Sequence, residues 1–131
     1  MKKSIGTTTL LGVMCLAAMP MLPVYAANWV YVSTDQNNAV NYYDSDTIRR
    51  SGNQVTVWEM VDFSRDKTVK ERVKKIRYRY DCSERTSTLL QMIIYYPDGS
   101  NETITLEAYE QKATALAPET IGEMMLETVC R

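Results

Sequence analysis

The sequence has no histidine among its 131 residues, and this absence excludes several classes of enzyme and metal site. Catalytic triads, histidine general bases and histidine-ligated zinc all require an imidazole. The three cysteines are too few for a tetrahedral zinc site built from cysteine alone. We therefore expect a non-catalytic protein that has neither a metal nor a cofactor.

The sequence also lacks an excess of charge of either sign. Lys and Arg number 15 against 16 Asp and Glu, which gives a net charge of −1. Proteins that neutralise nucleic-acid phosphates carry a clear positive excess, so we expect no nucleic-acid partner. With 131 residues, of which 45% are hydrophobic, the chain is long enough for one compact domain and too short for two.

The N-terminal segment has the three parts of a secretory signal peptide. Two lysines precede an apolar stretch, two prolines interrupt it, and Val24-Tyr25-Ala26 provides small residues at positions −3 and −1 of a cleavage site. A membrane-spanning helix needs about 20 unbroken apolar residues, so we expect no membrane span. We interpret residues 1–26 as a signal peptide and residues 27–131 as the exported domain.

The exported domain retains two cysteines, Cys82 and Cys130. An even number of cysteines in an oxidising compartment predicts a disulfide. The third cysteine, Cys15, follows Gly12-Val13-Met14, which is not a lipobox. We therefore expect the protein to be periplasmic or secreted.

Most of the exported domain shows the residue alternation of β-strands. Polar turns separate the apolar runs, and Pro97-Asp98-Gly99-Ser100 is typical of a hairpin turn. The runs predict strands over residues 29–32, 40–43, 55–63, 75–82, 90–96 and 103–109, the last two with Leu90, Met92, Ile94, Tyr96, Ile104, Leu106 and Ala108 inward.

A change to helical spacing predicts a C-terminal helix. Pro118 and Glu119 suit its first turn. Cys130 lies opposite Ile121 on the helical wheel, so we expect the last turn to unwind to bring its sulfur to the sheet. The overall prediction is an α+β fold, a twisted antiparallel sheet of five or six strands with the helix linked to it by the disulfide. The helical spacing itself is seen in an apolar stripe along the predicted helix, which consists of Ile121, Met124, Met125, Thr128 and Val129.

Charge is unevenly distributed along the exported domain. Residues 65–85 contain nine Lys or Arg and four acids, whereas residues 98–127 contain seven acids and one lysine. Lys75, Arg77 and Arg79 alternate with Ile76, Tyr78 and Tyr80, so the three cations point away from the core.

Three interpretations of these cations stay open. They bind an anionic partner, such as a glycan, a lipopolysaccharide phosphate or an acidic protein surface. Alternatively, they only solvate an outer face and discourage edge-to-edge aggregation. In the third interpretation, the basic and acidic regions of two copies meet and form a homodimer.

Tyrosines and paired aspartates are the other candidates for recognition. In Tyr42-Tyr43 and Tyr95-Tyr96, one member of each pair should face the core and the other the surface. Outward tyrosines suit protein or sugar binding and are also ordinary in strands. Asp44 and Asp46 resemble part of the carboxylate pair of a glycosidase or part of a calcium-binding loop. Because the sequence Asp-Ser-Asp is also common in turns, we interpret these residues as a turn.

Several short motifs follow one another in a fixed order along the exported domain. They are Trp29, Tyr42-Tyr43-Asp44 with Thr47-Ile48, Gly52 before Val55-Thr56-Val57-Trp58, Tyr80-Asp81-Cys82, Asp98-Gly99, Pro118-Glu119-Thr120 and Val129-Cys130. In this order, the domain resembles the surface-adhesin protein E-like family of Gram-negative exported proteins. The resemblance covers nearly all of residues 27–131.

The resemblance implies a six-stranded antiparallel sheet with a C-terminal helix and a Cys82–Cys130 disulfide. It also implies dimers and a role in binding host matrix and plasma proteins. The sequence departs from the family's lipoprotein form because it lacks a lipobox. We expect an exported, non-catalytic binding module for host matrix or plasma proteins or anionic glycans. The alternative is a periplasmic inhibitor or accessory protein that docks on an envelope enzyme or complex.

Overall fold

The computed structural model describes residues 26–131 and, ahead of them, only Ser4, Gly6, Gly12 and Ala17. The predicted signal peptide therefore lies almost entirely outside the described residues. In chain order the elements are β1 (Trp29–Thr34), β2 (Val40–Asp44), η1 (Ser45–Thr47, a 3₁₀-helix), β3 (Arg49–Ser51), β4 (Gln54–Asp62), β5 (Val73–Asp81), β6 (Thr86–Tyr95), β7 (Asn101–Thr105), η2 (Ala108–Glu110, a 3₁₀-helix), β8 (Thr114–Ala115) and α1 (Ile121–Val129).

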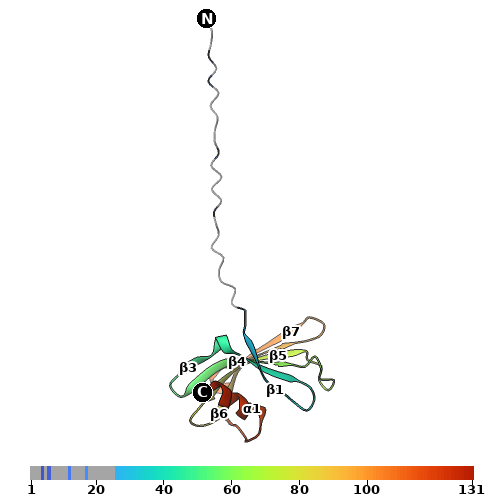
Figure 1. The fold of residues 1–131 in the computed structure, drawn as a ribbon, viewed down its shortest axis with the longest axis vertical. Coiled ribbons are helices and arrows are strands. Elements are labelled where there is room, and N and C mark those ends of the chain that lie inside the picture. The colour runs from blue at the N-terminus through green and yellow to red at the C-terminus, as the bar shows by residue number, and fades with distance from the viewer. Residues whose placement is uncertain (1–3, 5, 7–11, 13–16, 18–25) are drawn as a thin grey trace.

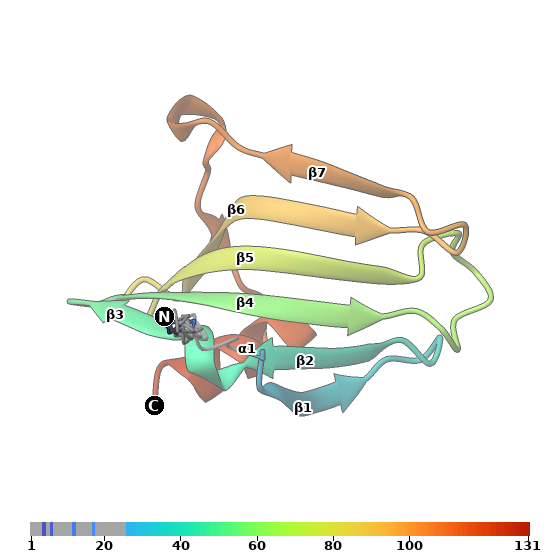
Figure 2. The same ribbon diagram turned by 90° about the horizontal axis from the view of Figure 1, so that it is seen from above.

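All strands belong to one antiparallel sheet. Six of them form its path, in the order β1-β2-β4-β5-β6-β7, with β3 beside β4 and β8 beside β6. Figure 2 shows the six strands side by side, with β1 and β7 at the two edges and α1 behind the sheet. Figure 1 shows the sheet from its edge, with α1 on one side of it. The predicted sheet and C-terminal helix are confirmed, whereas β3 and β8 are too short for a sequence alternation to indicate them.

The core lies between the sheet and α1. Val55, Val57 and Tyr80 are almost fully buried on the face of β4 and β5 that α1 covers, which we call the covered face. Side chains alternate along a strand, so the residues between them point to the opposite face, which we call the open face. Helix α1 contributes Met125, Leu126 and Val129 to the core.

The disulfide between Cys82 and Cys130 joins the end of α1 to the residue after β5, with the two Cα atoms 5.7 Å apart. This confirms the predicted pairing. The predicted unwinding of the last turn is wrong, because the Cys130 N–H still donates a helical hydrogen bond to the Leu126 carbonyl at 2.9 Å. The bridge forms from the C-cap position, which places the sulfur just beyond the helical turns.

Two arginines add polar contacts that the sequence did not indicate. Arg85 Nη2 lies 3.0 Å from a carboxylate oxygen of Glu123 and 2.6 Å from one of Glu127, both on α1. Arg50 Nη2 donates to the Val129 carbonyl at 2.6 Å, which satisfies one of the free carbonyls at the helix C-terminus. The helix is therefore held at its outer face, its C-terminus and its disulfide.

The start and orientation of α1 differ from the prediction. Thr120 is the N-cap and accepts a hydrogen bond from the Glu123 N–H, so the helix begins at Ile121 and not at Pro118. Met124, expected in the apolar stripe, is 46% exposed, while Leu126 is buried. Met125 and Val129 are buried as predicted, so only Met124 departs from the predicted stripe, in a nine-residue helix with few turns from which to read its facing side.

Strand β6 contains an irregularity that changes the predicted facing of Leu90, whereas Met92 and Ile94 lie on the covered face as predicted. Tyr78 pairs with Leu89 and Arg77 pairs with Gln91, so Leu90 is an extra residue with no partner in β5. Leu89 therefore takes the place on the covered face that the alternation assigned to Leu90. A single sequence gives no signal of such a bulge.

The hairpin after β6 is confirmed, whereas the strand after it is shorter than predicted. Gly99 has a φ of +87°, and the Tyr96 N–H donates to the Ser100 carbonyl at 3.0 Å. Strand β7 ends at Thr105, and Ala108, predicted to be inward, is exposed in η2.

The Asp44-Ser45-Asp46 segment has the turn role that its composition indicates. Asp44 is 3% exposed, and its Oδ1 accepts hydrogen bonds from the Asn28 N–H at 2.9 Å and the Asp46 N–H at 3.1 Å. This carboxylate therefore caps η1 and holds the start of β1. In the part of the chain that the structure describes, no helix has the length and apolarity needed to cross a membrane.

Candidate binding surface

The three cations predicted to point away from the core lie in a row on the open face of β5. We call Lys75, Arg77 and Arg79 the basic row; they lie opposite Met60, Trp58 and Thr56 of β4. Neighbours in the row are about 7 Å apart along the strand. Strand β5 is central, between β4 and β6. The part of the second interpretation by which these cations discourage edge-to-edge aggregation is therefore wrong, whereas solvation of an outer face stays open.

The three side chains differ in their surroundings. Arg77 is exposed, whereas Lys75 and Arg79 are half-buried. Arg79 Nη1 is 3.5 Å from Gln111 Oε1, a long contact to a neutral group. Among the described residues, none of the three forms an ion pair, and the ion pairs present involve other cations. The positive charge of the row is therefore not neutralised by neighbouring carboxylates.

Lys75 lies between two aromatic rings that come from other strands. Its Nζ is 5.3 Å from the centre of the Tyr95 ring and 5.8 Å from the centre of the Trp29 ring. An ammonium group is attracted to the face of such rings by about 0.5–1 kcal/mol at an exposed site. These contacts hold the Lys75 charge on the open face, and the sequence did not predict them because the two rings lie on β1 and β6, far from Lys75 in the chain.

The open face also carries the outward members of the tyrosine pairs. Tyr42 lies opposite Met60 and contacts Tyr31 edge to face, with ring centres 6.3 Å apart, while Tyr43 packs against the core. The predicted division of the pair between the two faces is confirmed. The aromatic residues of the open face are Trp29, Tyr31, Tyr42, Trp58 and Tyr95.

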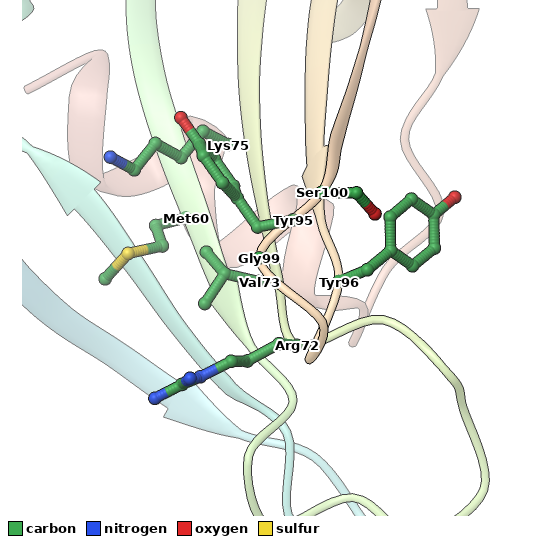
Figure 3. Close-up of a pocket in the computed structure, with 8 residues that line it drawn as sticks. All are labelled: Met60, Arg72, Val73, Lys75, Tyr95, Tyr96, Gly99 and Ser100. Carbon is green, nitrogen blue, oxygen red and sulfur yellow. The ribbon is translucent and has the colours of Figure 1, made fainter.

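A hollow of about 420 Å³ lies at one end of the basic row (Figure 3). Arg72 and Lys75 extend to the same side of the β6–β7 hairpin, while Tyr96 points to the other side. The Arg72 N–H donates to the Tyr95 carbonyl at 2.8 Å, which fixes the backbone of this fourth cation. The lining consists of Met60, Arg72, Val73, Lys75, Tyr95, Tyr96, Gly99 and Ser100.

This arrangement favours binding over chemistry. Uncompensated cations raise the local concentration of anionic groups. Half-buried aromatic rings add flat apolar area and hydrogen-bonding hydroxyls, which are enriched where proteins bind other molecules. The open face therefore combines positive charge that no described ion pair neutralises with aromatic surface.

A buried carboxyl lies on the covered face of β4, on the side opposite to the basic row. Glu59 is 9% exposed and accepts a hydrogen bond from the Tyr80 hydroxyl. Burial raises the pKa of Glu59 from 4.5 to about 8, although the hydrogen bond from Tyr80 opposes this. Burial also raises the pKa of Tyr80 and of Tyr78, and the charge of Glu59 raises both further. This group influences stability and lies away from the open face.

Comparison with known proteins adds independent information on the chain. Residues 29–131 match a family model described as surface-adhesin protein E. A comparison with curated protein sequences finds no match. Crystal form II of Haemophilus influenzae protein E is similar with a TM-score of 0.56 and 17% identity, over 76% of this chain and 86% of that chain. The selenomethionine form of Haemophilus influenzae protein E has a TM-score of 0.55 and 15% identity, over 81% of this chain and 92% of that chain.

A structure of protein E from non-typeable Haemophilus influenzae has a TM-score of 0.54 and 16% identity, over 82% of this chain and 79% of that chain. At such identities the likeness to the three structures shows the fold alone. The family model, in contrast, matches the sequence itself over residues 29–131. Adhesins bind and do not catalyse. The chain belongs to the surface-adhesin protein E family, a family of bacterial adhesins.

Proposed function

We propose that this protein is an exported adhesin-type module whose open face binds an anionic partner. The partner is an acidic surface of a host matrix or plasma protein, or an anionic glycan. One observation carries the proposal: the basic row is free of ion pairs in the described structure and lies among five aromatic side chains on the face that α1 leaves uncovered. Membership of an adhesin family supports the binding role.

Reversal of the charge of the basic row tests this proposal. We expect the triple variant Lys75→Glu/Arg77→Glu/Arg79→Glu to elute from a heparin column at a lower salt concentration than the wild type. Exposed ion pairs contribute up to about 1 kcal/mol each, so the loss of three with added repulsion predicts a fall in affinity on the order of tenfold or more. Heparin serves here as a linear anionic probe.

A second triple variant controls for net charge. Arg65→Glu/Lys67→Glu/Lys70→Glu makes the same change in the exposed segment between β4 and β5. We expect its elution to remain closer to that of the wild type. Equal shifts for the two variants would mean that heparin responds only to net charge, and an unchanged elution of the basic-row variant would contradict the proposal.

We also propose that residues 1–26 are a signal peptide, removed before the domain 27–131 acts outside the cytoplasm. The charged start, the apolar stretch and the small residues at Val24 and Ala26 support this. The intact mass of the protein recovered from the periplasm or the medium should begin at Ala27, and a mass that includes the first 26 residues would contradict the proposal.

Two copies are proposed to associate through their opposite charges. The basic row of one copy would face acidic residues of the segment 98–127 of another, as electrostatic complementarity favours. Glu123 and Glu127 are already paired with Arg85, which leaves the acids of 98–110 and Glu119 as the available partners. Sedimentation velocity should show a dimer at low salt that dissociates at high salt, and a monomer at every salt concentration would refute the association.

A further inference from the structure

Strand β7 is a free edge of the sheet. It lies at one end of the strand order, and Figure 2 shows it at the border of the sheet. All five of its residues are exposed, including Ile104 at 38%. An edge strand presents backbone N–H and C=O groups without partners, to which another strand can be added.

The register of β7 identifies which backbone groups are free. Thr105 lies opposite Gln91, and the Leu106 N–H donates to the Leu90 carbonyl at 3.0 Å, beside this pair. In an antiparallel ladder, this pattern marks Thr105 and Gln91 as a pair without mutual hydrogen bonds. The N–H and C=O groups of Thr105, and by alternation those of Thr103 and Asn101, therefore point outward from the sheet.

The two edges of the sheet differ in how they are protected. The register of β1 against β2 shifts between Tyr31 and Ser33, a bulge of the kind that disrupts pairing at an edge. Strand β7 pairs with β6 without a shift, and its sequence contains neither proline nor lysine. Of the two edges, β7 is therefore the one suited to accept a further strand.

The charge around β7 is of one sign. Residues 86–111 contain no Lys or Arg, and the acids of this stretch, Asp98, Glu102, Glu107 and Glu110, flank or lie within β7. We infer that β7 is the docking site for an extended, basic peptide segment of a partner protein, which pairs with it as an additional antiparallel strand. The free backbone groups provide the hydrogen bonds, and the acids select positive charge.

The same charge disfavours a second copy of this chain as the occupant. A two-fold axis through Thr103 would place two acidic stretches side by side, and like charges across an interface oppose association. The site also differs from the basic row, which lies on the central strand β5. Charge reversal of the basic row therefore keeps this site intact, and it also removes the proposed charge-linked dimer as a competitor for the acids around β7.

A synthetic eight-residue peptide of alternating Lys and Val is the probe, with the same length of alternating Glu and Val as its control. We expect the basic peptide to bind with at least tenfold higher affinity than the acidic one in isothermal titration calorimetry. Thr103→Pro should abolish the binding, because it removes an outward N–H while leaving the ladder to β6 intact. Thr103→Ala keeps this N–H and should bind like the wild type.

Amide hydrogen exchange of the wild-type protein makes the test independent of how the proline variant folds. The amides of Thr103 and Thr105 should exchange more slowly when the basic peptide is bound. Unchanged exchange at both amides, or equal binding of the two peptides, would overturn the inference. A dimer in sedimentation that Thr103→Pro abolishes would also overturn it, since a second copy would then be the occupant.

Discussion

Without its disulfide, the domain is expected to lose about 4 kcal/mol of its free energy of unfolding. Cys82 and Cys130 are 48 positions apart, and loop-closure entropy in the unfolded chain gives this magnitude for a loop of that length. The double variant Cys82→Ala/Cys130→Ala removes the bridge without leaving thiols. Urea unfolding followed by circular dichroism measures the difference, as a lower midpoint with a similar slope.

Reductant provides the control for this prediction. The wild type should lose stability on reduction, whereas the double variant should be insensitive to reductant. The contacts of Met125, Leu126 and Val129 with the sheet remain in both proteins, so the helix still has its apolar face to bury. Equal stability of the oxidised wild type and the double variant would show that the bridge does not stabilise the fold.

The free energy of unfolding is expected to fall as the pH rises from about 5 to about 8, by about 1 kcal/mol per pH unit. Burial raises the pKa of Glu59 from 4.5 to about 8, so the folded protein keeps a proton that the unfolded chain releases. In this range unfolding releases that proton, and a rising pH therefore favours unfolding. Below pH 4.5 and above about pH 8, both states have the same ionisation of Glu59 and its contribution is constant.

Glu59→Gln removes this titration and keeps an oxygen that accepts the hydrogen bond of Tyr80. We expect the variant to be more stable than the wild type at pH 8 and to show a flatter dependence on pH. Burial raises the pKa of the neighbouring Tyr78 above its ordinary value, and the charge of Glu59 raises it further, so Tyr78 stays protonated over this range. Glu84→Gln, at an exposed position, should leave the slope of the free energy of unfolding against pH unchanged. If Glu59→Gln showed the slope of the wild type, the assignment of this pH dependence to Glu59 would be contradicted.

The parts of the fold that sequence predicts well are those with a regular period. Val55 and Val57 alternate with polar or amphipathic residues along β4, so this strand was predicted, and the alternation of Ile76 and Tyr80 with cations along β5 predicted both the strand and its facing. The disulfide followed from the number of cysteines in an exported domain. These features depend on local pattern or on simple counting.

The features that the sequence did not predict depend on tertiary contacts. The extra residue Leu90 puts Leu89 on the covered face in its place, and nothing in the run of apolar residues marks this bulge. The cation–π contacts of Lys75 join β1, β5 and β6, and the high pKa of Glu59 follows from its burial in the folded domain. The sequence predicted which residues form the basic row. Their position on a central strand of the sheet follows only from the strand order.

The most direct test of binding at the open face uses the two tryptophans of the chain. Trp29 lies near Lys75 and Trp58 lies opposite Arg77, so both report on the open face and neither on the covered face. Intrinsic fluorescence during a titration with heparin should change and saturate with the same midpoint as binding measured by calorimetry. Saturable binding that leaves the emission of both tryptophans unchanged would place the ligand elsewhere and contradict the account.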